Sequence, residues 1–273
     1  MTASNNELSA YIDAWSHSAD QVIQLGRDLS ADDFLGGTDL PEWSVQDIYA
    51  HLAALEAALA GAPDDAAAMS MMKSAVITPS FTEIGVDARR GIPADAVIDE
   101  LATHVETRQR GLSADPPADP EALATGLSDG LSWDWRTLLR NRAVDMWVHE
   151  QDIRRAVGRP GNLDGSGARV AVTTFAQAMP YVIGKRVGAP PGTIVAWNVT
   201  GDAGFSASIG VGDDGRAREL EVPSDSPAVE LALSAEAFAI LGAGRRDRRA
   251  VDVKTSGDAE LAGEILASMV LTS

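Results

Sequence analysis

Apolar residues recur at helical spacing through the first half of this chain. The first stripe comprises Leu8, Tyr11, Ile12, Trp15, Val22 and Leu25. Ser44 and Asp47 have the spacing of a helix cap, and the stripe that follows them comprises Ile48, Leu52, Leu55 and Leu59. A third stripe starts after Pro93 with Val97, Leu101 and Val105, and a fourth helix is predicted from Trp133 to Gly158. Spacings of three and four residues place side chains on one helix face, so the pattern predicts four long helices that form a bundle.

The segments between these helices have a different composition. Residues 61–93 predict a loop with short helical pieces, and "SADPPADPEA" predicts a proline-rich loop before the fourth helix. The fourth helix ends at "GRPG", because glycine and proline terminate helices.

One more helix is predicted after "GRPGNLDGSG", over residues 168–187. Beyond it, apolar and polar residues alternate, as they do in strands. "TIVAWNVT" and "GFSASIGVG" predict two strands joined by a turn, and "RARELEVP", "AVELALS" and "AVDVKTSG" predict three more. Residues 235–242 and 259–269 predict helices. The sequence therefore predicts a helical bundle in residues 1–163 and a small α+β domain in residues 164–273.

Charge and composition exclude several classes of protein. The formal net charge is -18, with 40 acidic and 22 basic residues, so the protein's field repels nucleic acid. The basic run Arg245–Arg249 is short and contains Asp247, which predicts a solvated loop or an anion contact. The N-terminus has neither the basic start nor the apolar run of a secretory signal, and no stretch suits a membrane span. We expect a soluble, cytoplasmic protein that binds neither nucleic acid nor a membrane.

Several familiar motifs are absent or lack their context. The chain contains no cysteine, which excludes disulfides, thiolate metal ligands and a catalytic thiol of its own. His149 and the residue after it open like the zinc-protease signature H-E-x-x-H, but the fifth position is Ile153. Gly126–Gly130 matches G-x-S-x-G, yet the preceding residues favour a helix or loop over the strand that a nucleophile elbow needs. Neither a P-loop nor a dinucleotide-binding glycine motif occurs.

The fourth predicted helix places two polar groups on the face that should meet the core. Asp145 and His149 stand four residues apart and therefore on the same side, one turn apart. His51 lies on the inner face of the second predicted helix. Two interpretations fit: these are hydrogen-bonded polar residues of the core, or they bind a divalent metal. Two histidines and a carboxylate form a standard three-ligand set, and bundle interiors recurrently hold such sites.

The sequence around these histidines resembles a known family. The segments "WSVQDIYAHLAALEAAL" around His51 and "RNRAVDMWVHEQDIRRAVGRP" around His149 are similar to the mycothiol-dependent maleylpyruvate isomerase family. The likeness continues into "WNVTGDAG", "LSAEAFAILGAGR" and "GDAELAGEILASM". It implies a DinB-like, metal-binding four-helix bundle followed by a sterol-carrier-like α+β domain.

The resemblance also implies a cofactor and a chemistry. A divalent metal, usually zinc, is held by three residues: His51 matches the first ligand and His149 the last, while Asp145 stands where the family has a glutamate. The family uses mycothiol, a low-molecular-weight thiol, and a metal that displaces the thiol proton makes it a nucleophilic thiolate. We therefore expect a metal-dependent, mycothiol-dependent isomerase or S-transferase that acts on an electrophilic small molecule such as a maleylpyruvate-like acid.

Two alternatives stay open at this point. The same site could activate water, which would make the protein a metal-dependent hydrolase. The bundle could also have lost its activity, which would leave a non-catalytic protein that binds a small molecule.

Further residues complete the expected site. Arg142 and Asp152 lie about one turn outside the ligands of the fourth helix, so we expect them to orient those ligands. We expect the thiol to bind in a cleft between the domains, because a bundle interior lacks room for a thiol carrying two rings.

A cation is expected to bind the anionic substrate. Arg245 and Arg246 are the predicted catalytic residues, with Lys185 and Arg186 as rivals. We expect the protein to be a monomer.

Overall fold

The computed structural model describes residues 3–62, 79–124 and 132–272. The chain divides into two compact units, Met1–Asn162 and Leu163–Ser273. The G-x-S-x-G segment, Gly126–Gly130, lies outside the described residues.

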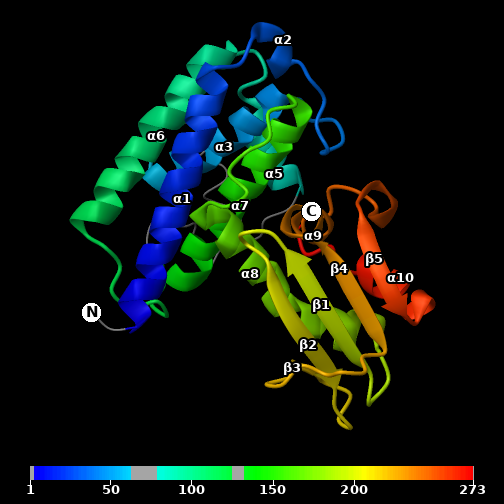
Figure 1. The fold of residues 1–273 in the computed structure, drawn as a ribbon. Helices are drawn as coiled ribbons and strands as arrows, with labels where there is room; N and C mark the ends of the chain where they lie inside the picture. Colours follow the sequence, from blue (N-terminus) through cyan, green and yellow to red (C-terminus); the bar gives the residue numbers. More distant parts are fainter. Residues whose placement is uncertain (1–2, 63–78, 125–131, 273) are drawn as a thin grey trace. The chain divides into compact units, whose positions relative to one another are not determined.

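The N-terminal unit is helical (Figure 1). Its described elements are α1 (Ala3–Arg27), α2 (Ala31–Phe34), α3 (Val45–Ala60), α5 (Pro79–Asp87), α6 (Ala94–Ala114) and α7 (Trp135–Ala156). Helices α1 and α3 each pack against both α6 and α7, and α5 packs on α3. The four long helices α1, α3, α6 and α7 form the predicted bundle.

Polar caps fix where the two helices that carry the candidate ligands begin. Ser44 and Asp47 form the predicted capping box: the Ser44 side chain accepts from the Asp47 N–H, and the Asp47 carboxylate accepts from the Ser44 N–H at 2.9 Å. Asp134 caps α7 by accepting the N–H of Thr137 at 2.7 Å. Because a cap residue stands outside the helix, α7 begins at Trp135, two residues after the predicted start.

Replacing Ser44 by alanine is expected to lower the free energy of unfolding by about 1 kcal/mol, because the Asp47 N–H loses its acceptor. Chemical unfolding followed by circular dichroism measures this. Ser30→Ala is the matched variant, since it removes the same capping box from the four-residue helix α2. Its effect should be smaller because less packed structure depends on α2, and equal losses would contradict this argument.

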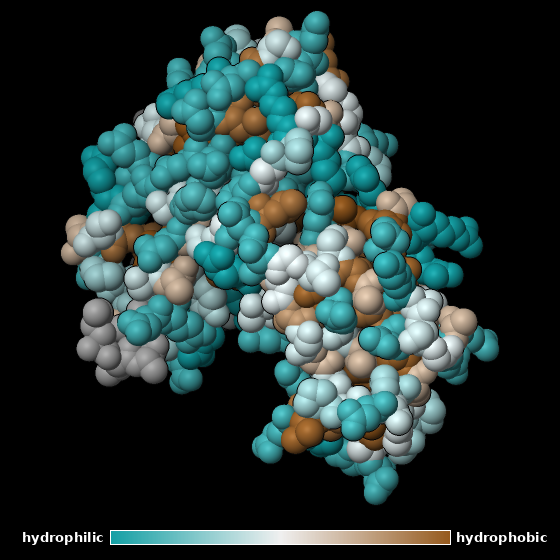
Figure 2. Space-filling model, viewed as in Figure 1, coloured by the Kyte–Doolittle hydropathy of each residue, from teal (hydrophilic) through white to brown (hydrophobic). Residues whose placement is uncertain are grey.

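Large apolar side chains fill the interior of the bundle. Trp15, Tyr49, Leu101 and Trp147, one from each long helix, are at most 2% exposed. Figure 2 shows mainly hydrophilic atoms over the visible face of this unit. Several ionisable groups are nevertheless buried within it: His51, Glu56, Arg89, Arg108, Arg142, His149, Glu150 and Asp152. Such groups are rare in cores unless they are paired or functional.

The C-terminal unit is α+β, as predicted. Its strands are β1 (Ile194–Thr200), β2 (Phe205–Val211), β3 (Ala217–Glu219), β4 (Val229–Ser234) and β5 (Val253–Gly257). They form one sheet in the order β3-β2-β1-β4-β5, in which β1 pairs antiparallel with β2 and parallel with β4. Alternate residues of β1 and β4 are buried, so one face of the sheet carries the apolar core.

The helical segments of this unit are α8 (Ser166–Tyr181), a π-helix (Val182–Val187), α9 (Ala235–Gly242), a short 3₁₀ helix (Arg248–Ala250) and α10 (Ala259–Ala267). Three of them, α8, α9 and α10, pack against strands of the sheet (Figure 1). Among all the described helices of the chain, none is long and apolar enough to cross a membrane.

One predicted helix is divided in the structure. The helix expected over residues 168–187 consists of α8 and the π-helix, and Pro180 lies in the last turn before the change. Proline has no backbone N–H and cannot donate to the carbonyl four residues earlier, so the hydrogen-bond spacing changes next to it. The strand expected in "RARELEVP" is also shorter and covers only residues 217–219.

Candidate metal centre

Three potential metal ligands meet between α3 and α7. His51 Nε2 on α3 lies 3.8 Å from Asp145 Oδ2, and His149 Nε2 on α7 lies 3.5 Å from Asp145 Oδ1. One ligand atom from each residue lies within 4.8 Å of the others, and the two imidazole rings meet edge to face with centroids 4.9 Å apart. The structure therefore brings together the three residues that the sequence indicates as ligands.

The environment of His51 fits a bound cation better than a satisfied polar core. Its side chain is buried, and neither ring nitrogen has a hydrogen-bond partner among the described residues. A buried polar group without a partner costs about 1–3 kcal/mol, so hydrogen bonding within the core does not account for this histidine. The Asp145 side chain is 31% exposed, which leaves the cluster accessible from one side.

The charges around the cluster also suit a cation. Burial opposes ionisation of Asp145, but Arg142 and His149 outweigh it and hold the pKa of that carboxyl well below its usual range. Burial lowers the pKa of His51 and keeps this imidazole neutral. Burial acts the same way on His149, but the Asp145 and Asp152 carboxylates outweigh it and raise its pKa. A histidine binds a metal through a deprotonated nitrogen, and of the two imidazoles His51 is the one whose lowered pKa favours that form.

Arg142 and Asp152 both contact the candidate ligands of α7. Arg142 Nη1 donates to Asp145 Oδ2 at 2.7 Å. Asp152 Oδ2 lies 3.2 Å from His149 Nδ1, an ion-pair contact that is not aligned as a hydrogen bond. Both residues are buried, at 5% and 0% exposure, so neither forms an ordinary surface salt bridge.

The contact with Asp152 continues to the loop before α3. Arg155 Nη2 donates to Asp152 Oδ1 at 2.5 Å, and Arg155 Nε donates to Asp39 Oδ2 at 2.8 Å. His149 is thus connected through two charged residues of its own helix to the loop that leads to His51.

Glu56 is a buried residue of this region that the sequence reading missed. It is fully buried and accepts hydrogen bonds from Trp15 Nε1 at 3.0 Å, from Arg142 Nη2 at 2.7 Å and from Arg108 Nη1. Arg108 also lies over the Trp15 ring, 4.5 Å from its centroid. Arg142 therefore bridges two carboxylates, Glu56 on α3 and a candidate ligand on α7.

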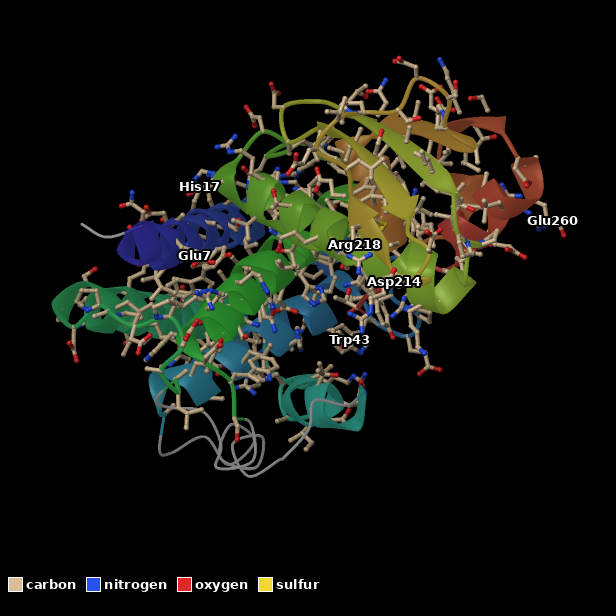
Figure 3. All side chains as sticks on the ribbon, turned by 90° about the horizontal axis from the view of Figure 1, so that it is seen from below. Glu7, His17, Trp43, Asp214, Arg218 and Glu260 are labelled. Atoms are coloured by element: carbon tan, nitrogen blue, oxygen red, sulfur yellow. The ribbon has the colours of Figure 1, made fainter. Side chains whose placement is uncertain are left out.

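Trp43 covers both imidazoles from the start of α3 (labelled in Figure 3). Its ring centroid lies 5.1 Å from that of His51 and 6.2 Å from that of His149. The indole Nε1 donates to Glu83 Oε2 of α5 at 3.1 Å, and Arg90 binds the same carboxylate at 2.6 Å. An anchored indole therefore forms one wall of the cluster.

The predicted substrate cations belong to the C-terminal unit. Arg245 and Arg246 follow α9, the first half-buried and the second exposed, and Arg245 Nη1 donates to the Ala243 carbonyl at 2.9 Å. The rivals Lys185 and Arg186 lie exposed on the π-helix, where Arg186 donates to the Ser268 carbonyl at 2.9 Å. Their role in the reaction stays a prediction.

Comparison with known proteins connects this geometry to a family. A family profile described as the mycothiol maleylpyruvate isomerase N-terminal domain matches residues 15–154. Two solved structures resemble the chain: the mycothiol-dependent maleylpyruvate isomerase and a mutant of it in which a histidine is replaced by alanine. Each has a TM-score of 0.58 and 14% sequence identity, and the match covers 95% of this chain and 98% of that chain. At this identity the likeness shows the fold. No curated protein sequence matches the chain.

The fold is that of a DinB-like helical bundle followed by an α+β domain, with a His–Asp–His cluster inside the bundle. The chain belongs to the mycothiol maleylpyruvate isomerase N-terminal domain family, because the matched residues 15–154 make up just over half of its length.

Proposed function

We propose that this protein is a metal- and mycothiol-dependent enzyme, an isomerase or an S-transferase, that acts on an electrophilic small molecule such as a maleylpyruvate-like acid. The cluster of His51, Asp145 and His149 carries the proposal, together with membership of the family. Two imidazoles and one carboxylate suit zinc, which we propose as the ion.

Each part of the cluster has a task in this proposal. His51 and His149 would supply neutral nitrogen ligands, and Asp145 would supply one negative charge, so that a position stays open for a substrate atom. A divalent ion bound there would lower the pKa of a thiol so that a thiolate forms near neutral pH. Because the chain contains no cysteine, the sulfur nucleophile has to come from a cosubstrate such as mycothiol.

The proposed isomerisation needs little from the protein beyond binding and charge. The thiolate forms a C–S bond at a cis double bond conjugated with a carbonyl, and the π-electron pair moves to the carbonyl oxygen. The former double bond rotates, and the returning electron pair expels the thiolate and leaves a trans double bond. An S-transferase would instead protonate the adduct and release it. Arg245 and Arg246 are our candidates for the cation that binds the anionic substrate.

The test measures metal content and turnover of the purified full chain. We expect bound zinc, and cis–trans isomerisation or S-alkylation that requires both zinc and mycothiol. Turnover of an ester or amide with zinc and without thiol would overturn the proposal in favour of a hydrolase. Zinc binding without turnover of any electrophile in the presence of mycothiol would overturn it in favour of a non-catalytic protein.

A further inference from the structure

Asp145 differs from the two histidines in that its carboxylate accepts a short hydrogen bond from an arginine, Arg142. Arg142 Nη1 contacts Asp145 Oδ2 at 2.7 Å, whereas the nearest histidine nitrogens lie 3.5 and 3.8 Å from the carboxylate oxygens. The arginine contact is the short one, so it fixes the rotation of the carboxylate and leaves Oδ1 directed at His149.

Arg142 has little freedom of its own. The residue is 5% exposed, and its second terminal nitrogen donates to Glu56 Oε1 at 2.7 Å. A planar guanidinium that binds two carboxylates at once is held in both position and plane. The Asp145 carboxylate is therefore set by a group whose other end is fixed on α3.

Glu56 is held from the remaining helices. Trp15 of α1 donates to its Oε1 at 3.0 Å, and Arg108 of α6 donates to its Oε2. All four long helices thus meet at this carboxylate. Glu56 stands on α3 only five residues after His51, so the contacts through Arg142 relate the ligand on α7 to the ligand on α3.

We propose that Arg142, held by Glu56, is a positioning residue that sets the metal affinity of the centre by orienting Asp145. The proposal rests on the metal site of the proposed function. An arginine beside a ligand also has an opposing effect, because its positive charge weakens the attraction of the carboxylate for a dication. The two effects predict opposite results when the arginine is removed.

The test is Zn²⁺ affinity of the full chain, measured by competition with a chromophoric chelator, with the absorption spectrum of bound Co²⁺ as a second readout. We expect Arg142→Gln to weaken Zn²⁺ binding about 10–100-fold, as loss of an orienting partner does, and to change the Co²⁺ spectrum. Arg142→Lys keeps the charge but cannot bridge both carboxylates, so it should recover only part of the affinity. Binding as tight as in the unmodified protein, or tighter, after Arg142→Gln would overturn the proposal.

Arg154→Gln is the matched control. Arg154 lies on the same helix and donates to a fully buried glutamate, Glu150, at 2.7 Å, but the structure shows no contact between it and the three ligands. Its replacement removes a guanidinium from a partly buried pair and should leave Zn²⁺ affinity unchanged. An equal loss of affinity in Arg142→Gln and Arg154→Gln would mean that the effect comes from bundle stability.

Glu56→Gln tests the second part of the proposal. It should weaken Zn²⁺ binding in the same direction as Arg142→Gln but by less, and the double variant should lose less than the two single losses combined, because both act through one contact. Additive losses would overturn the role of Glu56. If Glu56→Gln does not fold, the proposal is tested by the two Arg142 variants alone. These variants should fold, because Glu56 is unchanged in them and still has Arg108 as a partner. Failure of the unmodified chain to bind Zn²⁺ would instead contradict the proposed function.

Discussion

His149→Ala is expected to abolish zinc retention while the bundle stays folded. The substitution removes one of the three proposed ligands, and we expect the remaining pair, His51 and Asp145, to lose the ion during dialysis against a weak chelator. Folding should survive because alanine is the best helix former, and because no buried charge loses its only partner. Asp152 keeps Arg155 at 2.5 Å, and Asp145 keeps its arginine at 2.7 Å.

Elemental analysis after dialysis and far-ultraviolet circular dichroism measure the two parts of this prediction. His104→Ala is the control, because it removes another imidazole from the same bundle. His104 is half-buried on α6 and forms an ion-pair contact with Glu100 at 3.9 Å. It should keep a full equivalent of zinc. One equivalent of zinc in His149→Ala, at unchanged affinity, would show that this histidine is not a ligand.

The meeting of the three candidate ligands could be predicted from sequence because these residues lie on regular helices. A spacing of four residues places Asp145 and His149 on one face whatever the surroundings of the helix. The capping box at Ser44 fixes the start of α3, and its apolar stripe then fixes the side on which His51 lies. The faces of α3 and α7 that carry these residues come together because packing the helices as a bundle buries the apolar stripes of both.

Glu56 and Arg108 could have been found by the same rule but were not. Glu56 follows Ile48 and Leu52 in steps of four, and Arg108 follows Val105 by three, so both continue an apolar stripe. Each residue alone is typical of a solvated helix end. Burying either charge alone would cost free energy, and only their pairing across 52 residues of sequence offsets this cost. Helical spacing within one segment does not predict such a long-range pair.

The position of Trp43 beside the two imidazoles could not be predicted from the sequence for a different reason. The loop from Gly36 to Trp43 lacks the regular spacing of apolar residues that predicts a helix or a strand, so its path depends on specific contacts. These include the bond from Arg155 to Asp39 at 2.8 Å and the bond from the indole to Glu83 at 3.1 Å. Such contacts join segments far apart in the chain, and turn residues alone do not define them.

Glu56→Gln is expected to destabilise the bundle by about 3–5 kcal/mol at neutral pH, measured by urea unfolding in the presence of a chelator so that no metal contributes. The change keeps the size of the side chain but leaves the buried guanidinium groups of Arg108 and Arg142 without the charge between them. Glu106→Gln is the control, because Glu106 and Arg110 form an exposed pair 3.7 Å apart. Such a pair contributes less than about 0.5 kcal/mol. Losses of similar size in both variants would show that the buried network adds no stability.

The same variant predicts a pH dependence with a definite sign. Burial would raise the pKa of Glu56, but the charges of Arg108 and Arg142 outweigh it, so the pKa in the folded protein lies below its usual value. A carboxyl whose pKa is lowered on folding adds stability above its unfolded pKa, about 4.3, and loses that contribution as the pH falls through the folded value. The difference in unfolding free energy between the unmodified protein and Glu56→Gln should therefore be constant from pH 7 to about 5 and shrink below about 4.3. A difference that stays constant down to the pH of acid unfolding would mean that the glutamate charge does not stabilise the fold.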